Sequence, residues 1–234
     1  YKRQNPDITL ANLLRELNKI EGKFRIRFVT SYPTDITDDL INAVAECDKV
    51  CEFFHIPMQS GNSRVLKEMN RRYNREQYFE IFKKIRNKFD EVEITSDFIA
   101  GFPGETEEEF QDTLSAIEEL EIDYSNTAIY SPRPFTKAGR MTDIFIPDEI
   151  KEERFQRLHE TNCKMTLKSN QKLVGKTYEV LCECQKTKKG KKMMNARTRT
   201  NKLVHFESDK DLTGEFVNVK ITKAQTWCLY AELV

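Results

Sequence analysis

The sequence predicts a parallel α/β domain followed by a small antiparallel five-stranded β-barrel. Strand-like apolar segments alternate with helices up to about residue 141, and this alternation is typical of parallel βα units. One long helix follows, and after it come only short strands separated by turn residues. Five short strands in about sixty residues indicate a small barrel. The pattern alone leaves open whether the first sheet is open or closes into a barrel.

The first domain begins with a helix that carries Leu10, Leu13, Leu14, Leu17 and Ile20 at helical spacing and stops at Gly22. Strands and further helices then alternate along the chain. The strands are expected at residues 24–29, 51–56, 92–100 and 124–130, and the helices at 37–47, 63–69, 75–89 and 105–120.

The second half starts with a long helix over residues 148–173, with Pro147 at its entry. Turn signals such as Lys189-Gly190 and Thr213-Gly214 separate the strands that follow. These strands are expected at 177–184, 193–198, 203–206, 216–221 and 227–233. We therefore expect a first domain over 1–146, a linking helix over 147–174 and a small barrel over 175–234.

Composition excludes several classes of protein. The chain has 234 residues, of which 38% are hydrophobic and 10% aromatic, so a packed core is expected and wholesale disorder is not. No apolar run reaches the roughly 18 to 20 residues that span a bilayer. The start, residues 1–6, has neither an initiator Met nor a signal-like apolar segment. We expect a chain taken from within a longer protein, in a cytoplasmic setting.

Charge is distributed unevenly although the formal net charge is zero. Residues 175–234 hold twelve Lys or Arg against seven Asp or Glu, and 186–202 hold eight positive residues and no acid. Such a run often marks contact with a polyanion, but a solvated hairpin explains it equally well.

The cysteines form no metal-binding pattern. There is neither a CxxC pair nor a CxxxCxxC cluster motif. Each lies in an apolar strand-like or helical pattern, so we expect reduced, structural thiols and no metal site from this chain. The six are Cys47, Cys51, Cys163, Cys182, Cys184 and Cys228.

The ends of four predicted strands have unusual sequences. Ligands of parallel βα arrays bind at the carboxyl ends of the strands, so these segments should share one rim. Gly101 and Gly104 allow close approach of a flat ligand, and Thr106 can cap the next helix, although a plain Gly-Pro turn fits as well. His55 is expected to make a local hydrogen bond rather than to act in catalysis. The four segments are Thr30–Pro33, His55–Asn62, Ser96–Thr106 and Tyr130–Pro134.

Taken together, these segments resemble the core of radical S-adenosylmethionine methylthiotransferases. The resemblance rests on RFVTSYP (27–33), HIPMQSG (55–61), SDFIAGFPGET (96–106) and SPRP (131–134), with MNRRY (69–73) between them. ARTRTNKLVHF (196–206) is similar to the TRAM domain of that family, a small RNA-binding barrel. The motifs occur in order across nearly the whole chain. The resemblance implies an incomplete, TIM-like β/α barrel of radical SAM type followed by an OB-like TRAM barrel.

The resemblance implies a function that this chain would perform only as part of a longer enzyme. The expected activity adds a methylthio group to C2 of N6-isopentenyladenosine beside the tRNA anticodon. The family uses S-adenosylmethionine, two [4Fe–4S] clusters and an electron donor such as flavodoxin or ferredoxin. The CxxxCxxC motif and the three further cysteines that hold these clusters are absent here. We therefore expect no catalytic residue in this chain and an inactive fragment.

The same resemblance implies cofactor contacts for six residues. Arg71 is expected to pair with the methionine carboxylate, because its planar fork suits bidentate binding. Ile99 and Gly101 are expected to face adenine. The complete set is Gln59, Ser60, Arg71, Asp97, Ile99 and Gly101.

The basic run is the predicted contact with the tRNA anticodon stem-loop. Lysines at the hairpin tip suit phosphates, and Arg197 and Arg199, two apart, are expected on one face. Phe206 and Trp227 are candidates for stacking on bases, although an aromatic in so small a barrel belongs more often to its core. The predicted contacts are Lys188, Lys189, Lys191, Lys192, Arg197, Arg199 and Lys202. Three alternatives remain: a methylthiotransferase for threonylcarbamoyl-adenosine tRNA, one for a ribosomal protein, and a non-catalytic RNA-binding module.

Overall fold

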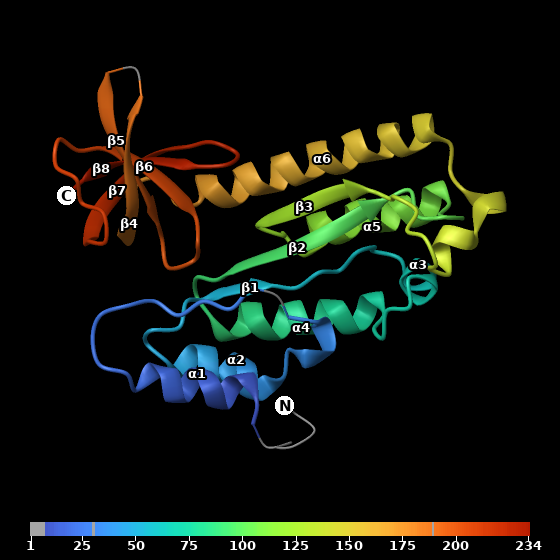
Figure 1. Ribbon diagram of the computed structural model, residues 1–234, viewed down its shortest axis with the longest axis horizontal. Coiled ribbons are helices and arrows are strands. Elements are labelled where there is room, and N and C mark those ends of the chain that lie inside the picture. Colours follow the sequence, from blue (N-terminus) through green and yellow to red (C-terminus); the bar gives the residue numbers. More distant parts are fainter. Residues whose placement is uncertain (1–7, 30, 189) are drawn as a thin grey trace.

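A parallel sheet and a closed barrel lie along the long axis of the molecule, and the long helix α6 (Asp148–Gln171) runs between them (Figure 1). The computed structural model describes residues 8–29, 31–188 and 190–234, without the side chain of Lys188. Within these ranges no helix has both the length and the apolar character needed to cross a bilayer.

The sheet has three parallel strands in the order β1 (Phe53–His55), β2 (Glu93–Ala100) and β3 (Tyr124–Ile129). On β2 the residues at even positions from Ile94 to Ala100 are fully buried. The hydroxyls of Ser96 and Tyr78 of α4 lie 3.1 Å apart, within hydrogen-bonding distance. Asp97 and Ile99, at odd positions, lie partly exposed on the opposite face. The alternation of a strand thus gives β2 one core face and one polar face.

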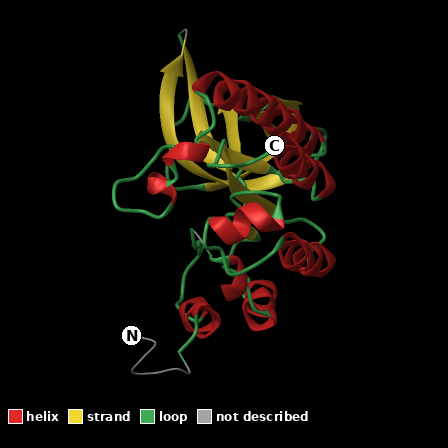
Figure 2. Ribbon diagram, turned by 90° about the vertical axis from the view of Figure 1, so that its right-hand side faces the viewer, coloured by secondary structure: helices red, strands yellow, loops and turns green. Residues whose placement is uncertain are grey.

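Six α-helices are described, and their N-termini follow local sequence signals. Thr106 accepts a hydrogen bond from the backbone of Glu109, whose side chain accepts one in return from the Thr106 N–H. This capping box confirms the predicted cap, and Asn74 forms another with Gln77. Figure 2 shows several helices nearly end-on, beside the strands. Besides α6 they are α1 (Leu10–Asn18), α2 (Asp38–Glu46), α3 (Ser63–Glu68), α4 (Arg75–Lys88) and α5 (Glu107–Glu119).

The predicted strand over 24–29 is wrong, because only Ile26 forms a bridge, to Val50. Ile26 and Phe28 pack against the core of the first domain. Arg25, the residue before Ile26, extends the other way, and its guanidinium donates to the carbonyls of Arg197 at 2.7 Å and Glu179 at 2.9 Å. The alternation in the sequence therefore reflects two different packing partners rather than a strand in a sheet.

The C-terminal strands close into a barrel in the order β4-β5-β6-β8-β7. The prediction of a wholly antiparallel barrel is wrong for one pair, since β6 and β8 run parallel. A ring of five strands cannot alternate in direction all the way round, so at least one neighbouring pair must be parallel. The strands are β4 (Thr177–Lys188), β5 (Lys191–Arg197), β6 (Leu203–Glu207), β7 (Phe216–Ala224) and β8 (Leu229–Leu233).

Helix α6 spans the sheet from its carboxyl end to its amino end. Asn162, near the middle, accepts from the backbone N–H of Ser125 on β3 at 2.9 Å. Asn170, in the last turn, donates to the carbonyls of Gln225 at 2.8 Å and Thr226 at 3.0 Å, between β7 and β8. The helix thereby fixes the barrel at the amino ends of the parallel strands, as Figure 1 shows.

Charged side chains of the barrel complete this docking. Arg199 donates to both carboxylate oxygens of Glu52 at 2.8 Å and to the carbonyls of Asp48 and Val50. Lys202 Nζ lies 3.3 Å from the Glu93 carboxylate, and both side chains are buried. All four partners precede or begin β1 and β2, so the interface lies at the amino end of the sheet.

The buried Glu93 makes the interface sensitive to pH. Burial raises the pKa of Glu93 to about 7, although Lys202 opposes the shift. The folded state therefore keeps a proton that the unfolded state loses above about pH 4.5. The free energy of unfolding should fall as pH rises from about 4.5 to about 7, with a Glu93 contribution of about 3 kcal/mol. Glu93→Gln should remove this contribution to the pH dependence of stability.

The measurement is urea unfolding of the wild-type chain and Glu93→Gln at pH 5 and at pH 8. The variant should gain stability relative to wild type at pH 8 and not at pH 5. Two stability curves that stay parallel across this range would contradict the prediction.

Candidate functional site

The carboxyl ends of the strands form one rim, and the strand-end segments meet there. The backbone of Gln59 bridges β2, donating to the Asp97 carbonyl at 2.8 Å and accepting from the Ile99 N–H at 3.0 Å. Ser31 donates to the carbonyl of His55 at 3.1 Å, and Tyr130 to that of Ala100 at 2.9 Å. Thr30, in the first of these segments, lies outside the described residues.

Gln59 and Ser60, in the segment that follows β1, lie in different environments. Gln59 has a φ of 74°, which is unusual for a residue with a side chain. Ser60 is fully buried, and its hydroxyl lies 3.4 Å from that of Thr113 on α5. A Cβ on Gly61 would lie 2.3 Å from the carbonyl oxygen of Asp112. This turn is therefore packed against α5, and the cap of α3 is Asn62 rather than the preceding residues.

Asp97 is held in a polar chain across all three strands. Its carboxylate lies 3.2 Å from His55 Nε2 and accepts from Asn126 Nδ2 at 2.9 Å. His55 Nδ1 lies 2.8 Å from the Thr95 hydroxyl, so the local hydrogen bonding expected for His55 is confirmed. Burial raises the pKa of Asp97, but the bonds from His55 and Asn126 outweigh it and leave the pKa lowered. The rim therefore carries a fixed negative charge.

Arg71 provides the opposite charge near the same rim. Its backbone N–H donates to the Leu66 carbonyl at 2.9 Å, just beyond α3. Its Nε is buried, and the guanidinium has no hydrogen-bond or ion-pair partner in the part of the chain that the structure describes. Tyr130, just after β3, likewise has a buried hydroxyl with no hydrogen-bond partner among the described residues. Unsatisfied buried donors are costly unless a ligand satisfies them, so these two groups fit a polar ligand such as an amino-acid carboxylate.

Gly101 follows β2 with a φ of 78°. A Cβ here would lie 2.4 Å from Cγ of Lys151, a flexible side chain on α6 that is paired with Asp148. Ile99 is partly exposed on the polar face of β2. The two residues expected to face adenine thus lie close in sequence at the rim, but Lys151 covers Gly101 and would have to move for a ligand to reach it.

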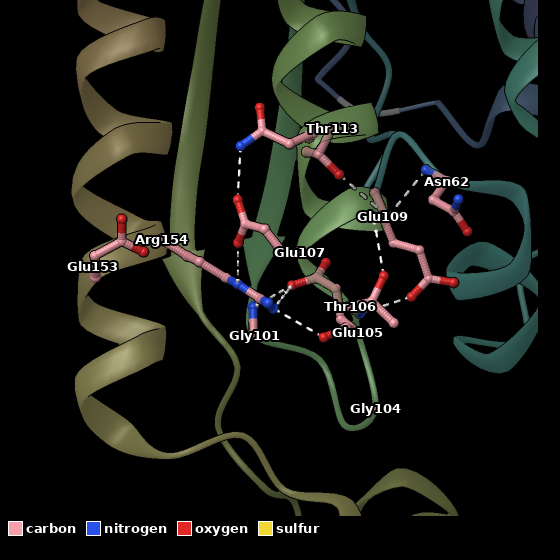
Figure 3. A network of polar contacts seen from close by, with 12 residues as sticks. Asn62, Gly101, Gly104, Glu105, Thr106, Glu107, Glu109, Thr113, Glu153 and Arg154 are labelled. Atoms are coloured by element: carbon pink, nitrogen blue, oxygen red, sulfur yellow. Dashed lines mark hydrogen bonds and ion pairs between the residues drawn. The ribbon is translucent and has the colours of Figure 1, made fainter.

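A buried ion pair holds the segment between Gly101 and Thr106 (Figure 3). Glu105 accepts from the Gly101 N–H at 3.0 Å and from Arg154 of α6 at 3.1 Å, and Arg154 also donates to the Glu105 carbonyl at 3.0 Å. Burial raises the pKa of Glu105, opposed by these two donors. Arg154 was missed in the sequence because its partner lies 49 residues away and nothing local distinguishes it from the other basic residues of α6.

The cysteines do not fit an iron–sulfur cluster. All six are free thiols, and three of them, Cys47, Cys51 and Cys182, are buried in the two cores. Among the described residues no group of three or more His, Cys, Asp or Glu side chains could hold a metal ion. A [4Fe–4S] cluster needs several thiolates close together, and these cysteines do not supply them.

The residues predicted to bind RNA separate into two sets. Arg199 and Lys202 form the docking contacts with Glu52 and Glu93, and Arg199 lies beyond the end of β5 instead of within it. Arg197 pairs with Glu183 at 3.1 Å and donates to the Asn201 carbonyl at 2.9 Å. Lys191 and Lys192 are exposed on the β4–β5 hairpin, where Lys191 pairs with the Glu207 carboxylate and Lys192 donates to the Asp209 carbonyl at 3.3 Å. Lys189 and the side chain of Lys188 lie outside the described residues.

A cavity of about 860 Å³ lies between the polar face of the sheet and the barrel. Arg27, His55 and Glu93 line it from the first domain, and Lys202 and Trp227 from the second. Trp227 is half exposed and meets Tyr124 of β3 edge-on at 5.7 Å, so the barrel-core interpretation is wrong for this residue. Phe206 is buried there, as expected. The cavity belongs to the domain interface and was not foreseen from the sequence.

Two family models match the chain. The model described as the radical SAM superfamily matches residues 5–117, and the TRAM domain model matches residues 171–234. Among solved structures, coproporphyrinogen III oxidase (HemN) from Escherichia coli, a radical SAM enzyme, is similar with a TM-score of 0.54 and 22% identity, covering 70% of this chain and 37% of that one. This likeness concerns the fold alone.

Curated relatives match nearly the whole chain. A tRNA-2-methylthio-N(6)-dimethylallyladenosine synthase of Clostridium perfringens is 49% identical over 228 residues, which are 97% of this chain and 51% of the relative. The proteins with the same name from Thermoanaerobacter pseudethanolicus and Acetivibrio thermocellus are 48% and 46% identical, each over 97% of this chain. The chain spans about half the length of these relatives.

The Glu105–Arg154 pair should be essential to stability. Arg154→Leu leaves the buried carboxylate of Glu105 without its cation, so the free energy of unfolding should fall by about 3–5 kcal/mol. Arg157→Leu is the matched control, because Arg157 also contacts Glu107 and the Phe110 ring but is 31% exposed. It should cost at most about 1 kcal/mol. Urea unfolding at neutral pH measures both, and equal losses would contradict the assignment.

Proposed function

We propose that this chain, which matches the radical SAM superfamily model over residues 5–117 and the TRAM domain model over residues 171–234, is the C-terminal part of a tRNA methylthiotransferase. The proposed reaction adds a methylthio group to C2 of N6-isopentenyladenosine beside the anticodon. The observation that carries the proposal is the 46–49% identity to synthases of that name across 97% of the chain. The shared name also supports this branch over those for threonylcarbamoyl-adenosine and for a ribosomal protein.

S-adenosylmethionine, with the iron–sulfur clusters of the complete enzyme, would supply the radical and the methyl group. The residues of this chain would bind and orient the cofactor. Arg71 offers its unpaired guanidinium to the methionine carboxylate, and Asp97 offers a fixed negative charge to the ammonium or ribose. Ile99, Gly101 and the turn at Gln59 and Ser60 complete the proposed pocket, provided that Lys151 moves aside.

The tRNA would bind the barrel through the exposed lysines of the β4–β5 hairpin. Lysines suit phosphates as point charges and give affinity with little sequence preference. Arg199 and Lys202 pair with carboxylates at the domain interface, and Arg197 pairs with Glu183. Lys191 also pairs with a carboxylate, that of Glu207, but both side chains are exposed, so a phosphate can compete for the lysine. The proposed RNA contact is therefore centred on Lys188, Lys189, Lys191 and Lys192. The anticodon stem-loop as the bound region, a flavodoxin or ferredoxin as electron donor, and a cytoplasmic location belong to the same proposal.

Arg71 provides the test of the cofactor site. In the complete enzyme, Arg71→Ala should weaken S-adenosylmethionine binding about 10- to 100-fold, because a charge-assisted hydrogen bond is lost. Arg72→Ala is the matched control, since Arg72 is exposed and only its backbone N–H bonds to Tyr32. Equilibrium dialysis measures affinity, and mass spectrometry of tRNA nucleosides measures the methylthiolated product. Wild-type enzyme that leaves isopentenyladenosine unmodified would overturn the proposed function, and equal affinities would overturn the role of Arg71.

The hairpin lysines should determine how RNA binding depends on salt. Replacing Lys188, Lys189, Lys191 and Lys192 with Ala should weaken tRNA binding and flatten the logarithmic salt slope by up to about 3. A control variant replaces four other exposed lysines, Lys84, Lys164 and Lys168 on helices and Lys172 just after α6. The net charge changes equally in both variants. Filter binding across a salt series distinguishes a specific surface from a general charge effect, which would weaken both alike.

A further inference from the structure

The proposed RNA-binding barrel and the proposed cofactor residues lie at opposite ends of the parallel strands. The barrel docks at the amino ends of the parallel strands, whereas the proposed cofactor residues lie at the carboxyl ends. Figure 1 shows the barrel at one end of the long axis and the segment between β3 and α6 at the other. A base that reaches the rim would therefore lie far from the hairpin lysines and would need a contact of its own near the rim.

Phe135 stands out in the segment that follows β3. Its side chain is 93% exposed, the largest value for a large apolar side chain among the described residues. Its φ is 66°, a left-handed conformation that costs a non-glycine residue roughly 1 kcal/mol or more. An aromatic ring that is both fully solvated and on strained backbone contributes nothing to folding, and such residues are concentrated at functional sites.

The turn that presents Phe135 is closed by hydrogen bonds. The carbonyl of Arg133 accepts from the Thr136 hydroxyl at 2.8 Å, and the same hydroxyl accepts from the Gly139 N–H at 3.0 Å. A Cβ on Gly139 would lie 2.3 Å from that Arg133 carbonyl oxygen. The close packing of Gly139 against Arg133 fixes the conformation of the turn, and the turn in that conformation exposes the Phe135 ring to solvent.

The turn that carries Phe135 is rich in positive charge. Arg133 and Arg140 are exposed and form no ion pair within the described ranges, while Lys137 lies 3.3 Å from the carboxylate of Glu68. Between residues 131 and 142 there is no acidic residue, and Asp143 is the first to follow. A solvated aromatic ring in the same turn as exposed guanidinium groups has the composition that binds unpaired nucleotides, since the ring stacks on a base and the cations bind phosphates.

We propose that Phe135 stacks on an unpaired base of the RNA substrate and that Arg133 and Arg140 bind the adjoining phosphates. This proposal rests on the proposed function and adds to it a second RNA contact, at the rim. Because Phe has no hydrogen-bonding group, the contact selects an unstacked base over a paired one without selecting its identity. The neighbours of Phe135 are polar or proline, so the ring lacks the surrounding apolar patch typical of a protein interface.

The test compares binding of two labelled RNAs to this chain by fluorescence anisotropy. One is a stem-loop with an adenosine-rich loop, and the other is the same stem as a closed duplex. Phe135→Ala should weaken stem-loop binding roughly 5- to 100-fold, the range for one lost base–aromatic stack, and leave duplex binding unchanged. Phe135→Trp should keep the affinity, and its fluorescence should be quenched by the stem-loop beyond the background from Trp227.

Two further variants separate stacking from other contacts. Phe135→Leu keeps an apolar side chain without a ring and should bind as weakly as Phe135→Ala, because Leu cannot stack on a base. Arg133→Ala with Arg140→Ala should flatten the salt slope for the stem-loop. Since Phe135 is solvated, all variants should unfold at the wild-type temperature.

A wild-type chain that binds the stem-loop no tighter than Phe135→Ala overturns the proposal. So does a Phe135→Leu variant with wild-type affinity for the stem-loop, because binding would then not depend on an aromatic ring. Neither outcome involves the methylthiolation step, so a failure here is distinct from a failure of the complete enzyme to form the product.

Discussion

The pair of Glu105 and Arg154 fixes the arrangement of the whole molecule. It joins the turn after β2 to the first part of α6, and the side chain of Glu105 is completely buried while that of Arg154 is 6% exposed. Once α6 is anchored at this end, Asn162 aligns it along β3 and Asn170 ties its other end to the barrel. A buried charge pair is not in itself strongly stabilising, but it strongly disfavours any arrangement that separates the two charges.

Cations in this protein serve two purposes that differ in solvation. Those at the domain interface, such as Arg25 and Arg199, donate to carbonyls and carboxylates of fixed position, and their geometry is satisfied within the chain. Those on the hairpin and around Phe135 remain exposed. The first set keeps the barrel at the amino end of the sheet, and the second leaves positive charge available at both ends of the long axis.

This arrangement separates non-specific phosphate binding at the barrel from the rim where a base would bind. Point charges at the barrel hold phosphates without regard to sequence, whereas stacking at the rim requires a base that has left its pair. The polar chain from Thr95 through His55 and Asp97 to Asn126 crosses the sheet between the two ends. Its bonds fix the carboxylate of Asp97, so the rim is charged and ordered without a ligand.

The sequence by itself determined the features that depend on local spacing. Apolar periodicity located the helices and most strands, Thr106 identified the start of α5, and the motifs pointed to a rim at the carboxyl ends. These features depend on residues within a few positions of one another, so a single chain segment contains the information.

Tertiary structure decided what the charged residues contact. Arg199 and Glu52 are 147 residues apart, and a guanidinium suits a carboxylate as well as a phosphate. Its position in a basic run therefore could not reveal that it holds two domains together. The same holds for Arg154, for the failed strand around Ile26, and for Phe135, whose solvation and left-handed backbone follow from the closed turn around it. In each case the deciding contact is made by a residue or a backbone geometry that the local pattern does not specify.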